Sequence, residues 1–522
     1  MRRLSDVNTT DLRGAIALGC ETMGRVFDRD DHGYPFFAAT VLPEARMAFN
    51  DSHSESHVPG RHLNALLVAE SVLGIAVPDE VIEGHARAAY FSYSELVALP
   101  LNRDRIDGYL VRFLPHNLRE GFHALYALAH FRQDERAFKL IDASIAAIRA
   151  YWSFADGWDA NSLGREYQVQ VHEWPGPFIT GIARALGPLV KIHRTLGIES
   201  AYDLATELRN ELLDGWFTPE GLHDIDRFGT HTHSTTCALS SLAQYADTYD
   251  DIEAMDAVQA FYDRGLPAIA NHIGWSIENC GPDANPDRGE CNNSGDILET
   301  ALILGRRRDS AYFQDGERII RSHLLPAQLR DIAFVPPSAG TDDGTTDVAQ
   351  RLRGAFGFPA PYGHAPIGAA DVGFNLDIVG GTVASLCEAV REGVTHNGDV
   401  TSINLLFDHD DERCTIESPY THDALTIRTT SARTVVVHLP DWADLAVIDA
   451  ALAQRDAARS GRKLTISSIG PDTPLTLPLS PPIREGVISH RDRDREVRTR
   501  GDEVIAMDAA GADLLFFPPM TH

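Results

Sequence analysis

The connection at residues 274–296, GWSIENCGPDANPDRGECNNSGD, carries the densest group of side chains that could do chemistry. It leads into an apolar helix and contains Glu278, Asp283, Asp287, Glu290 and Asp296 among Gly, Asn and Trp residues. Hydrolysis of a glycosidic bond needs two carboxyl groups, one to protonate the leaving oxygen and one to activate water or attack the sugar. The connection is compatible with that chemistry. The alternative is that these acids cap a helix and face solvent.

Three other long polar connections could contribute to the same site. They span residues 49–64, 159–177 and 223–234. His53 and His57 are four residues apart, and His231 and His233 are two apart. Either spacing could serve a metal, but no His-Glu-x-x-His or Cys-x-x-Cys pattern is present. We therefore expect no metal and no cofactor, and we expect these histidines to bind sugar hydroxyls or structural carbonyls.

Two further side chains in these connections have a binding and a structural interpretation. Trp174 could offer an apolar face to a sugar ring, or it could plug the fold. Arg61 could reach a carboxylate, or it could anchor its own loop. Trp275, Asn292 and Asp296 complete the residues that we expect to contact substrate.

The elements that must position these residues are helical up to about residue 395. About twelve segments have apolar residues at helical spacing, and short polar links join them in pairs, such as 116–131 with 135–152. Paired helices of this number must share one core. The pattern predicts an (α/α)6 barrel. An open solenoid is the alternative, but no repeat of fixed period supports it.

After residue 395 the apolar period changes to two. We expect strands at 399–407, 413–418, 424–430, 434–440, 463–469 and 513–518. The segments 457–462 and 481–502 are interpreted as solvated loops. The predicted fold is therefore mainly α with an all-β C-terminal domain: a catalytic barrel domain at residues 1–395 and a β-sandwich domain at residues 396–522.

The composition of the 522-residue chain narrows the class of partner. Its 46 Lys and Arg residues against 75 Asp and Glu residues give a net charge of −29, which disfavours nucleic acids and anionic membranes. No apolar run is long enough to span a bilayer, and the first residues do not form a secretory signal. Six scattered cysteines indicate reduced thiols, so we expect a cytoplasmic protein. An acidic surface permits a homodimer without implying one.

Several segments resemble one family of enzymes. The stretch 289–329 contains Gly-Glu-Cys-Asn-Asn at the opening of a helix, 380–390 is a second helix segment, and 401–407 and 432–444 read as strands, the latter with a Pro-x-Trp ending. Together they resemble the β-L-arabinofuranosidase family, glycoside hydrolase family 127 and its relatives. The resemblance covers about residues 270–445, and the first 250 residues share only the helical rhythm.

The resemblance implies specific roles and specific losses. In that family a glutamate and three cysteines hold zinc, one cysteine thiolate attacks the anomeric carbon, and an upstream glutamate is the acid/base. By position, Glu290 matches the motif glutamate and Glu278 the upstream acid. The cysteine positions fall on Asn292 (or, with a slip of one residue, on Cys291) and on Gly380 and Gly381. This chain therefore resembles a divergent member without the nucleophile and most of the zinc ligands.

The resulting expectation is a glycoside hydrolase for a small oligosaccharide or glycoside. It would use carboxylate acid/base catalysis, with Glu278 as proton donor and Glu290 as base or substrate-binding group. One alternative is a uronate-oligosaccharide lyase, which needs a Tyr or His base and a group that neutralises the uronate. His231, His233, Tyr167 and Arg61 are available for it. The other alternative is a non-catalytic sugar-binding protein.

Overall fold

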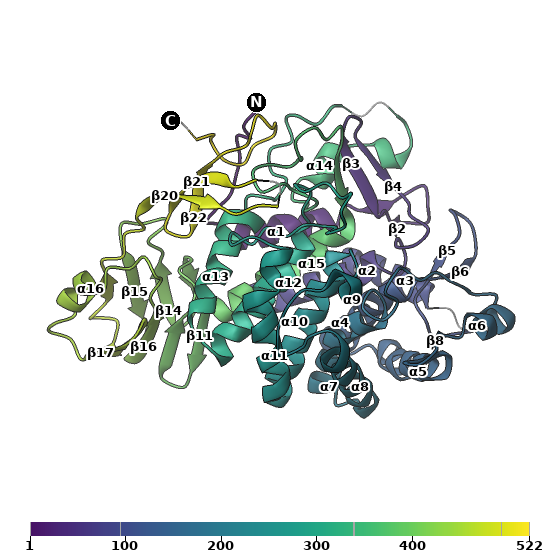
Figure 1. Ribbon diagram of the computed structural model, residues 1–522, viewed down its shortest axis with the longest axis horizontal. Helices are drawn as coiled ribbons and strands as arrows, with labels where there is room; N and C mark the ends of the chain where they lie inside the picture. Colours follow the sequence, from purple (N-terminus) through teal and green to yellow (C-terminus); the bar gives the residue numbers. More distant parts are fainter. Residues whose placement is uncertain (1, 94–95, 338–339, 492, 521–522) are drawn as a thin grey trace.

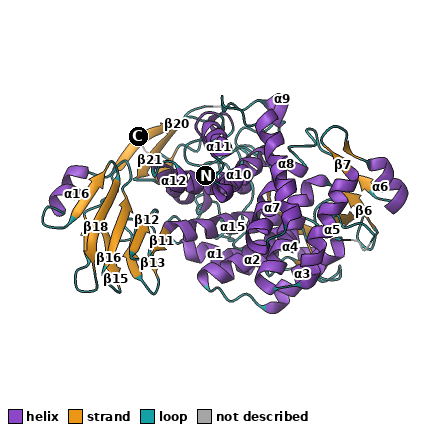
Figure 2. Cartoon of the chain, turned by 90° about the horizontal axis from the view of Figure 1, so that it is seen from below, coloured by secondary structure: helices purple, strands orange, loops and turns teal. Residues whose placement is uncertain are grey.

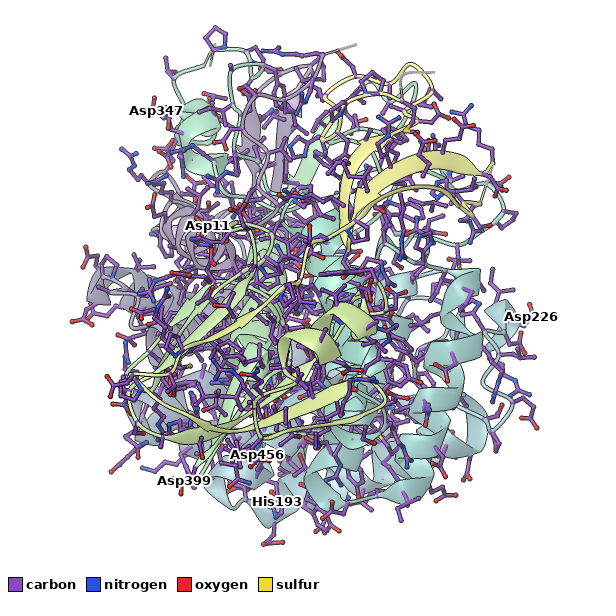
Figure 3. All side chains as sticks on the ribbon, turned by 90° about the vertical axis from the view of Figure 1, so that its left-hand side faces the viewer. Asp11, His193, Asp226, Asp347, Asp399 and Asp456 are labelled. Atoms are coloured by element: carbon purple, nitrogen blue, oxygen red, sulfur yellow. The ribbon has the colours of Figure 1, made fainter. Side chains whose placement is uncertain are left out.

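A computed structural model describes residues 2–93, 96–337, 340–491 and 493–520. Helices predominate up to Gly393 and strands predominate after it, as the change of apolar period predicts (Figure 2). Among the described residues, none of the helices combines the length and the hydropathy needed to cross a bilayer. Exposed carboxylates such as Asp226, Asp399 and Asp456 lie on the surface, where water solvates part of the acidic excess (Figure 3).

Six helices form a closed ring at the centre of the helical part. They are α2 (Val58–Leu73), α4 (Leu118–Arg132), α7 (Leu186–Leu196), α10 (Thr232–Tyr249), α12 (Cys291–Arg307) and α15 (Leu376–Gly393). Each packs against the next in chain order, and α15 packs against α2 (Figure 1). The first turn of α12 is buried although it is polar: every residue from Cys291 to Leu298 is buried. Polar residues in such turns must therefore find partners inside the protein.

A second set of helices covers the ring from outside. It comprises α1 (Leu12–Met23) on α15 and α2, α3 (Asp79–Ser92) on α2 and α4, α5 (Glu135–Tyr151) on α4, α8 (Glu199–Gly215) on α7, α11 (Ile252–Arg264) on α10 and α13 (Ala311–Ile319) on α12. These helices are amphipathic. In α5, Ala137, Ile141, Ile145 and Ile148 share the buried face, and the carboxylate of Asp134 accepts the backbone N–H of the second helical residue at 2.8 Å.

Short helices and strands occupy the connections. The helices are α6 (Ala160–Tyr167), α9 (Ile225–Phe228) and α14 (Val348–Leu352). The strands are β1 (Phe27–Asp28) with β2 (Tyr34–Pro35), β7 (Trp152–Ser153) with β8 (Gly157–Trp158), and two three-stranded sheets: β10 (Val372–Asn375), β3 (Ala38–Leu42) and β4 (Arg46–Ala48); β5 (Leu101–Arg103), β6 (Leu110–Phe113) and β9 (Gln170–Val171).

Two sheets in the C-terminal region share an apolar core of their own. The five-stranded sheet has the order β11 (Val394–Asn397), β12 (Val400–Ile403), β16 (Arg433–His438), β18 (Lys463–Ile469), β17 (Ala457–Ser460). The four-stranded sheet has the order β13 (His409–Asp410), β14 (Cys414–Glu417), β15 (Leu425–Thr429), β19 (Leu475–Leu477), and α16 (Leu445–Ala451) follows β16. Ile416, Ile427, Val435 and Ile466 meet in this core. Five of the six predicted strands are present.

The remaining predictions for this region were wrong in three places. The segment 457–462, interpreted as a solvated loop, contains β17, which pairs with β18 at the edge of the five-stranded sheet. Residues 513–518 form no strand, because Leu514 has a φ of +56° and Leu515 makes only isolated bridges. The segment 481–502, interpreted as a solvated loop, instead contributes β20 (Ile483–Ile488) and β21 (Arg495–Arg500), which pair with each other and, through β21, with β22 (Glu503–Met507). Val497 and Val504 pack into the helical core rather than between the two larger sheets. The many charged residues of segment 481–502 hid the period-two alternation of apolar residues that predicts strands.

This last hairpin clamps the connection at 274–296. His490 and Arg495 each reach Oδ1 of Asp287 at 2.8 Å, and the hydroxyl of Tyr362 donates to Oδ2 at 2.7 Å. Asp287 is buried, not solvated. The clamp fixes the connection just before Glu290 and the first turn of α12.

Candidate active site

The six inner helices begin at one place, where their first turns and the residues just before them bring charged and imidazole side chains together. This inner cluster comprises His57, Arg61, Arg119, Glu120, Arg184, His233, Glu290, Asn292, Asp296 and Asp377. Arg184 lies in the short 3-10 helix η2 (Ile182–Ala185) that precedes α7. All ten residues are buried. Helix N-termini present free N–H groups and the positive end of the helix dipole, which favour anionic side chains.

Two carboxyl groups of the inner cluster share one amide. Asn292 Nδ2 donates to Glu290 Oε1 at 3.1 Å and to Asp377 Oδ2 at 3.3 Å. Burial, with the charges of Glu278 and Asp377, raises the pKa of Glu290 to about 8. Burial alone would also raise the pKa of Asp377, but the hydrogen bond from His57 and the charge of Arg61 hold it well below its ordinary value. At neutral pH the Glu290 carboxyl group is thus protonated and the Asp377 carboxyl group is ionised.

A fully buried glutamate lies beneath this pair. Glu120 contacts Arg184 at 3.0 Å and Arg61 at 3.1 Å. Burial opposes its ionisation, but Arg184 and the other cations lower its pKa to about 2. His57 bridges the two levels: its Nδ1 bonds to Oδ1 of Asn117 at 2.8 Å and lies 3.4 Å from Glu120, and its Nε2 lies 3.2 Å from Asp377. This bridge fixes the orientation of the Asp377 carboxylate.

His233 faces Glu290 from the other side. Its Nε2 accepts hydrogen bonds from Arg61 Nη2 at 3.0 Å and from Arg119 Nη1 at 3.3 Å. Burial and these guanidinium groups lower the pKa of His233 well below its usual value, so the ring is neutral. The remaining nitrogen, Nδ1, must carry the proton, and it lies 3.7 Å from Glu290 Oε1.

Aromatic rings border the inner cluster. The ring centroid of His116 lies 4.2 Å from Trp174, 5.2 Å from His231 and 5.6 Å from His57, on which it stacks. His53 lies 6.0 Å from Trp174. Burial lowers the pKa of both His53 and His231 to about 3, so these rings are neutral. Because His53, Trp174 and His231 are only half-buried, this aromatic wall connects the cluster with the surface.

The structure brings together most residues that the sequence singled out. His57, Arg61, His233, Glu290, Asn292 and Asp296 lie in the inner cluster, and His53, Trp174 and His231 lie in the aromatic wall. Glu278 lies outside the inner cluster and is more exposed than its members. Its side chain is 29% exposed, it pairs with Arg288, and it lines a surface hollow of about 380 Å³. Its charge is one of the causes that raise the pKa of Glu290.

Two residues do not join these groups. Trp275 is 1% exposed, donates its indole N–H to the carbonyl of Pro359 at 2.9 Å and packs against His490, so it anchors the start of the connection in the core. Tyr167, a candidate base for a lyase, instead contacts the hydroxyl of Tyr151 at 3.1 Å.

Sequence reasoning missed several members of the cluster. Arg119, Glu120 and Asp377 sit in segments that read as ordinary amphipathic helices, and Arg184 precedes one. The available signal was the adjacent Arg119 and Glu120 in an otherwise apolar run, because charges in a fully buried helix must be paired.

The positions that match the family's cysteines do lie together. A Cβ atom on Gly381 would collide with Oδ1 of Asn292 and lie 2.9 Å from Arg61 Nη1, and a Cβ on Gly380 would lie 2.7 Å from the carbonyl carbon of Arg61. The Arg61 guanidinium and the Asn292 amide thus fill the space beside Gly381, and the Arg61 backbone carbonyl and the His62 ring fill the space beside Gly380. These residues do not fit a zinc ion held by three cysteines.

Comparison with protein-family models found no match, and neither did comparison with curated proteins. Comparison with solved structures found similar chains. A GH127 β-L-arabinofuranosidase from Geobacillus stearothermophilus T6 is 11% identical with a TM-score of 0.51, covering 94% of this chain and 80% of that chain. A GH127 β-arabinofuranosidase is 12% identical with a TM-score of 0.56, covering 96% and 83%.

A sugar epimerase from a ruminal bacterium is 11% identical with a TM-score of 0.51, covering 72% of this chain and 99% of that one. At such identities the likeness concerns the fold. The resemblance that the sequence predicts is therefore confirmed at that level: this chain shares its fold with the β-L-arabinofuranosidases of glycoside hydrolase family 127.

Proposed function

We propose that this chain is a glycoside hydrolase in which Glu290 donates the proton and Asp377 is the ionised partner. The observation that carries the proposal is the shared amide of Asn292, which holds together one carboxyl group with a raised pKa and one with a lowered pKa. Carboxyl groups whose environments drive their pKa values apart are typical acid and base pairs. The roles differ from the sequence-based expectation, in which Glu278 was the donor.

The spacing favours retention of configuration. Both oxygens accept from one nitrogen at 3.1 and 3.3 Å, so they lie closer together than the about 6.5–9.5 Å that inverting enzymes use. Asp377 attacks the anomeric carbon while the glycosidic C–O bond breaks and the leaving oxygen takes the proton of Glu290. Water then attacks the glycosyl ester and gives its proton to Glu290, which restores both groups.

The surroundings support a small carbohydrate as substrate. Trp174, His53 and His231 are partly exposed beside the inner cluster, and the apolar face of a sugar packs on such rings. We further propose that the closed ring of six helices with its outer helices is an (α/α)6 barrel over residues 1–395. The two larger sheets with one core would be the β-sandwich of residues 396–522.

The test is hydrolysis of a panel of aryl glycosides and short oligosaccharides, including arabinofuranosides, by three purified variants. Glu290→Gln and Asp377→Asn should each lower turnover by about 10²–10⁴-fold. Glu299→Gln, on the same helix but bonded to Ser240 and Ser385, should retain it. Circular dichroism confirms folding. Near-normal turnover in either of the first two variants contradicts the assignment.

A second candidate, a uronate lyase, has one observation in its favour. His233 lies 3.0 Å from Arg61, which places a neutral base beside a cation. However, Glu120 already pairs with Arg61, so that charge is not available to a uronate. Ultraviolet absorbance from an unsaturated product, with no reducing-end release from saturated glycosides, would establish the lyase instead. Binding without turnover of either substrate class would indicate a sugar-binding protein.

A further inference from the structure

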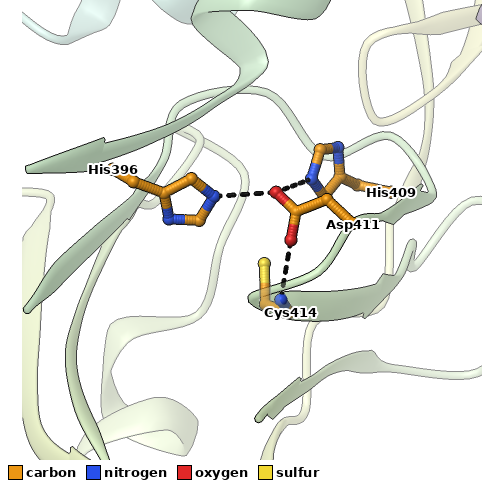
Figure 4. A group of neighbouring side chains, drawn as sticks. All are labelled: His396, His409, Asp411 and Cys414. Atoms are coloured by element: carbon orange, nitrogen blue, oxygen red, sulfur yellow. Dashed lines mark hydrogen bonds and ion pairs between the residues drawn. The ribbon is translucent and has the colours of Figure 1, made fainter. Parts of the chain in front are cut away.

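A second cluster of metal-binding residue types lies in the C-terminal region, outside the inner cluster. It consists of His396 on β11, His409 on β13, Asp411 in the following turn and Cys414 on β14 (Figure 4). One ligand atom from each residue lies within 4.8 Å of the ligand atoms of all the others. We propose that these four side chains form a zinc-binding site.

The two imidazoles converge on one oxygen. Nε2 of His396 lies 2.9 Å from Oδ2 of Asp411, and Nε2 of His409 lies 3.0 Å from the same atom. The other nitrogen of His396, Nδ1, contacts the hydroxyl of Thr401 at 3.0 Å, which turns Nε2 inward. A histidine ligand of a metal is usually oriented in this way through its second nitrogen.

The carboxylate and the thiol are held by the turn itself. Oδ1 of Asp411 accepts the backbone N–H groups of Arg413 at 2.7 Å and Cys414 at 2.8 Å, so Oδ2 is the oxygen left for the histidines. The turn therefore places the Cys414 side chain against the same carboxylate. Three of the four ligands come from only six residues of chain, 409–414.

The ligand types select the metal. Two imidazole nitrogens, one thiolate and one carboxylate are a set that tetrahedral zinc accepts, with bonds of about 2.0–2.3 Å. Calcium and magnesium require mostly oxygen ligands and would not use the sulfur atom. Small side-chain rotations would bring the ligand atoms to the required spacing, because they already lie within 4.8 Å of one another.

The four side chains differ in solvent exposure, which leaves the proposed site open to an ion on one side. Cys414 is 1% exposed, whereas the side chains of His396, His409 and Asp411 are 13%, 22% and 30% exposed, which leaves a route for the ion. When the S–Zn bond forms, the S–H bond breaks and its proton passes to solvent.

A zinc ion here would join two sheets. His396 belongs to the five-stranded sheet, and His409 and Cys414 belong to the four-stranded sheet. An ion bound to both would link them across their shared core, and binding to the folded state alone raises its stability.

The test uses the full chain, depleted of metal with a chelator and then dialysed against Zn²⁺. The expected result is one tightly bound zinc per chain and a higher midpoint of thermal unfolding. With Co²⁺ in place of Zn²⁺, absorption from a thiolate–cobalt bond should appear. Cys414→Ser should abolish that absorption, and His396→Gln should weaken zinc binding at least about tenfold.

Two control variants separate this site from other histidines. His422→Gln changes an exposed histidine that lies near Asp408 in the same region. His231→Gln disrupts the group of His116, His231 and His233, which is another set of metal-binding residue types among the described residues. Both should keep one zinc. If Cys414→Ser fails to fold, the His396→Gln variant, whose side chain is less buried than that of Cys414, decides. Absence of zinc binding, or binding unchanged in His396→Gln and lost in His231→Gln, overturns the proposal.

Discussion

Arg61 donates from Nη2 to Nε2 of His233 at 3.0 Å, and this contact fixes the proton of His233 on Nδ1. That nitrogen faces Oε1 of Glu290, which also accepts from Asn292. With Oε1 thus facing donors, the acid proton of Glu290 belongs on Oε2, the oxygen that is left for a leaving group. The Arg61 guanidinium therefore orients the proposed proton donor through one imidazole.

The charge of Glu278 should be visible in the pH dependence of activity. It is one of the causes that raise the pKa of Glu290 to about 8. Because Glu290 must be protonated to act, activity falls as the pH rises through that pKa. Glu278→Gln removes a negative charge, so the alkaline limb of the kcat/KM profile should move to lower pH while turnover at pH 6 stays within about tenfold of the unmodified enzyme.

Glu299→Gln should leave the alkaline limb in place and serves as the matched control. A loss of turnover by orders of magnitude at every pH in Glu278→Gln would instead make Glu278 the proton donor.

The clamp at Asp287 should contribute strongly to stability. Burial opposes ionisation of Asp287, but hydrogen bonds from His490 and Tyr362 and the charge of Arg495 lower its pKa to about 2. Asp287→Asn should lower the free energy of unfolding by about 3–5 kcal/mol, because it removes one charge of a buried ion pair. Asp283→Asn, exposed in the same connection, should change it little.

This difference should itself depend on pH. The pKa of Asp287 is depressed in the folded state, so its contribution is full above an unfolded pKa of about 3.9 and is lost as the pH falls through about 2. Urea unfolding at a series of pH values measures it. A gap between the unmodified chain and Asp287→Asn that does not narrow toward pH 2 contradicts the clamp.

The glycine beside Asn292 should be required for the shared amide. A Cβ atom on Gly381 would collide with Oδ1 of Asn292. Gly381→Ala should therefore cost about 1–3 kcal/mol of stability and lower turnover by displacing the amide. Gly393→Ala, at the end of the same helix, meets Leu405 only at an ordinary 3.7 Å and should be close to neutral. Thermal unfolding and kinetics of both variants test this, and equal effects would refute it.

Local pattern was enough to predict the helical N-terminal part and most of the strands that follow it. Apolar stripes at helical spacing identified pairs such as α4 with α5, and period-two alternation identified β14, β15, β16 and β18. It failed at β20 and β21, where Arg495 is buried against Asp287 more than two hundred residues earlier. When the partner of a buried charge is this distant in the chain, the sequence alone does not distinguish that charge from a solvent-exposed one.

The candidate site was predicted only in part, again because some of its residues meet only through contacts between distant parts of the chain. Loops rich in His, Glu and Asn identified His57, His233 and Glu290, because polar loops before helices commonly carry function. Glu120 and Asp377 lie inside helices, and only the closing of the ring brings them to Glu290. Trp275 is the opposite case: the sequence predicted that it contacts substrate, but its ring is packed in the core and its indole N–H donates to the carbonyl of Pro359.

The protonation of Glu290 is the most direct measurement of the proposed mechanism. Infrared difference spectra of the unmodified chain and of Glu290→Gln should show one protonated carboxyl group that persists at pH 7, titrates near pH 8 and is missing from the variant. A spectrum without that group at pH 7, or one in which Glu290→Gln retains it, would contradict the assignment of Glu290 as proton donor.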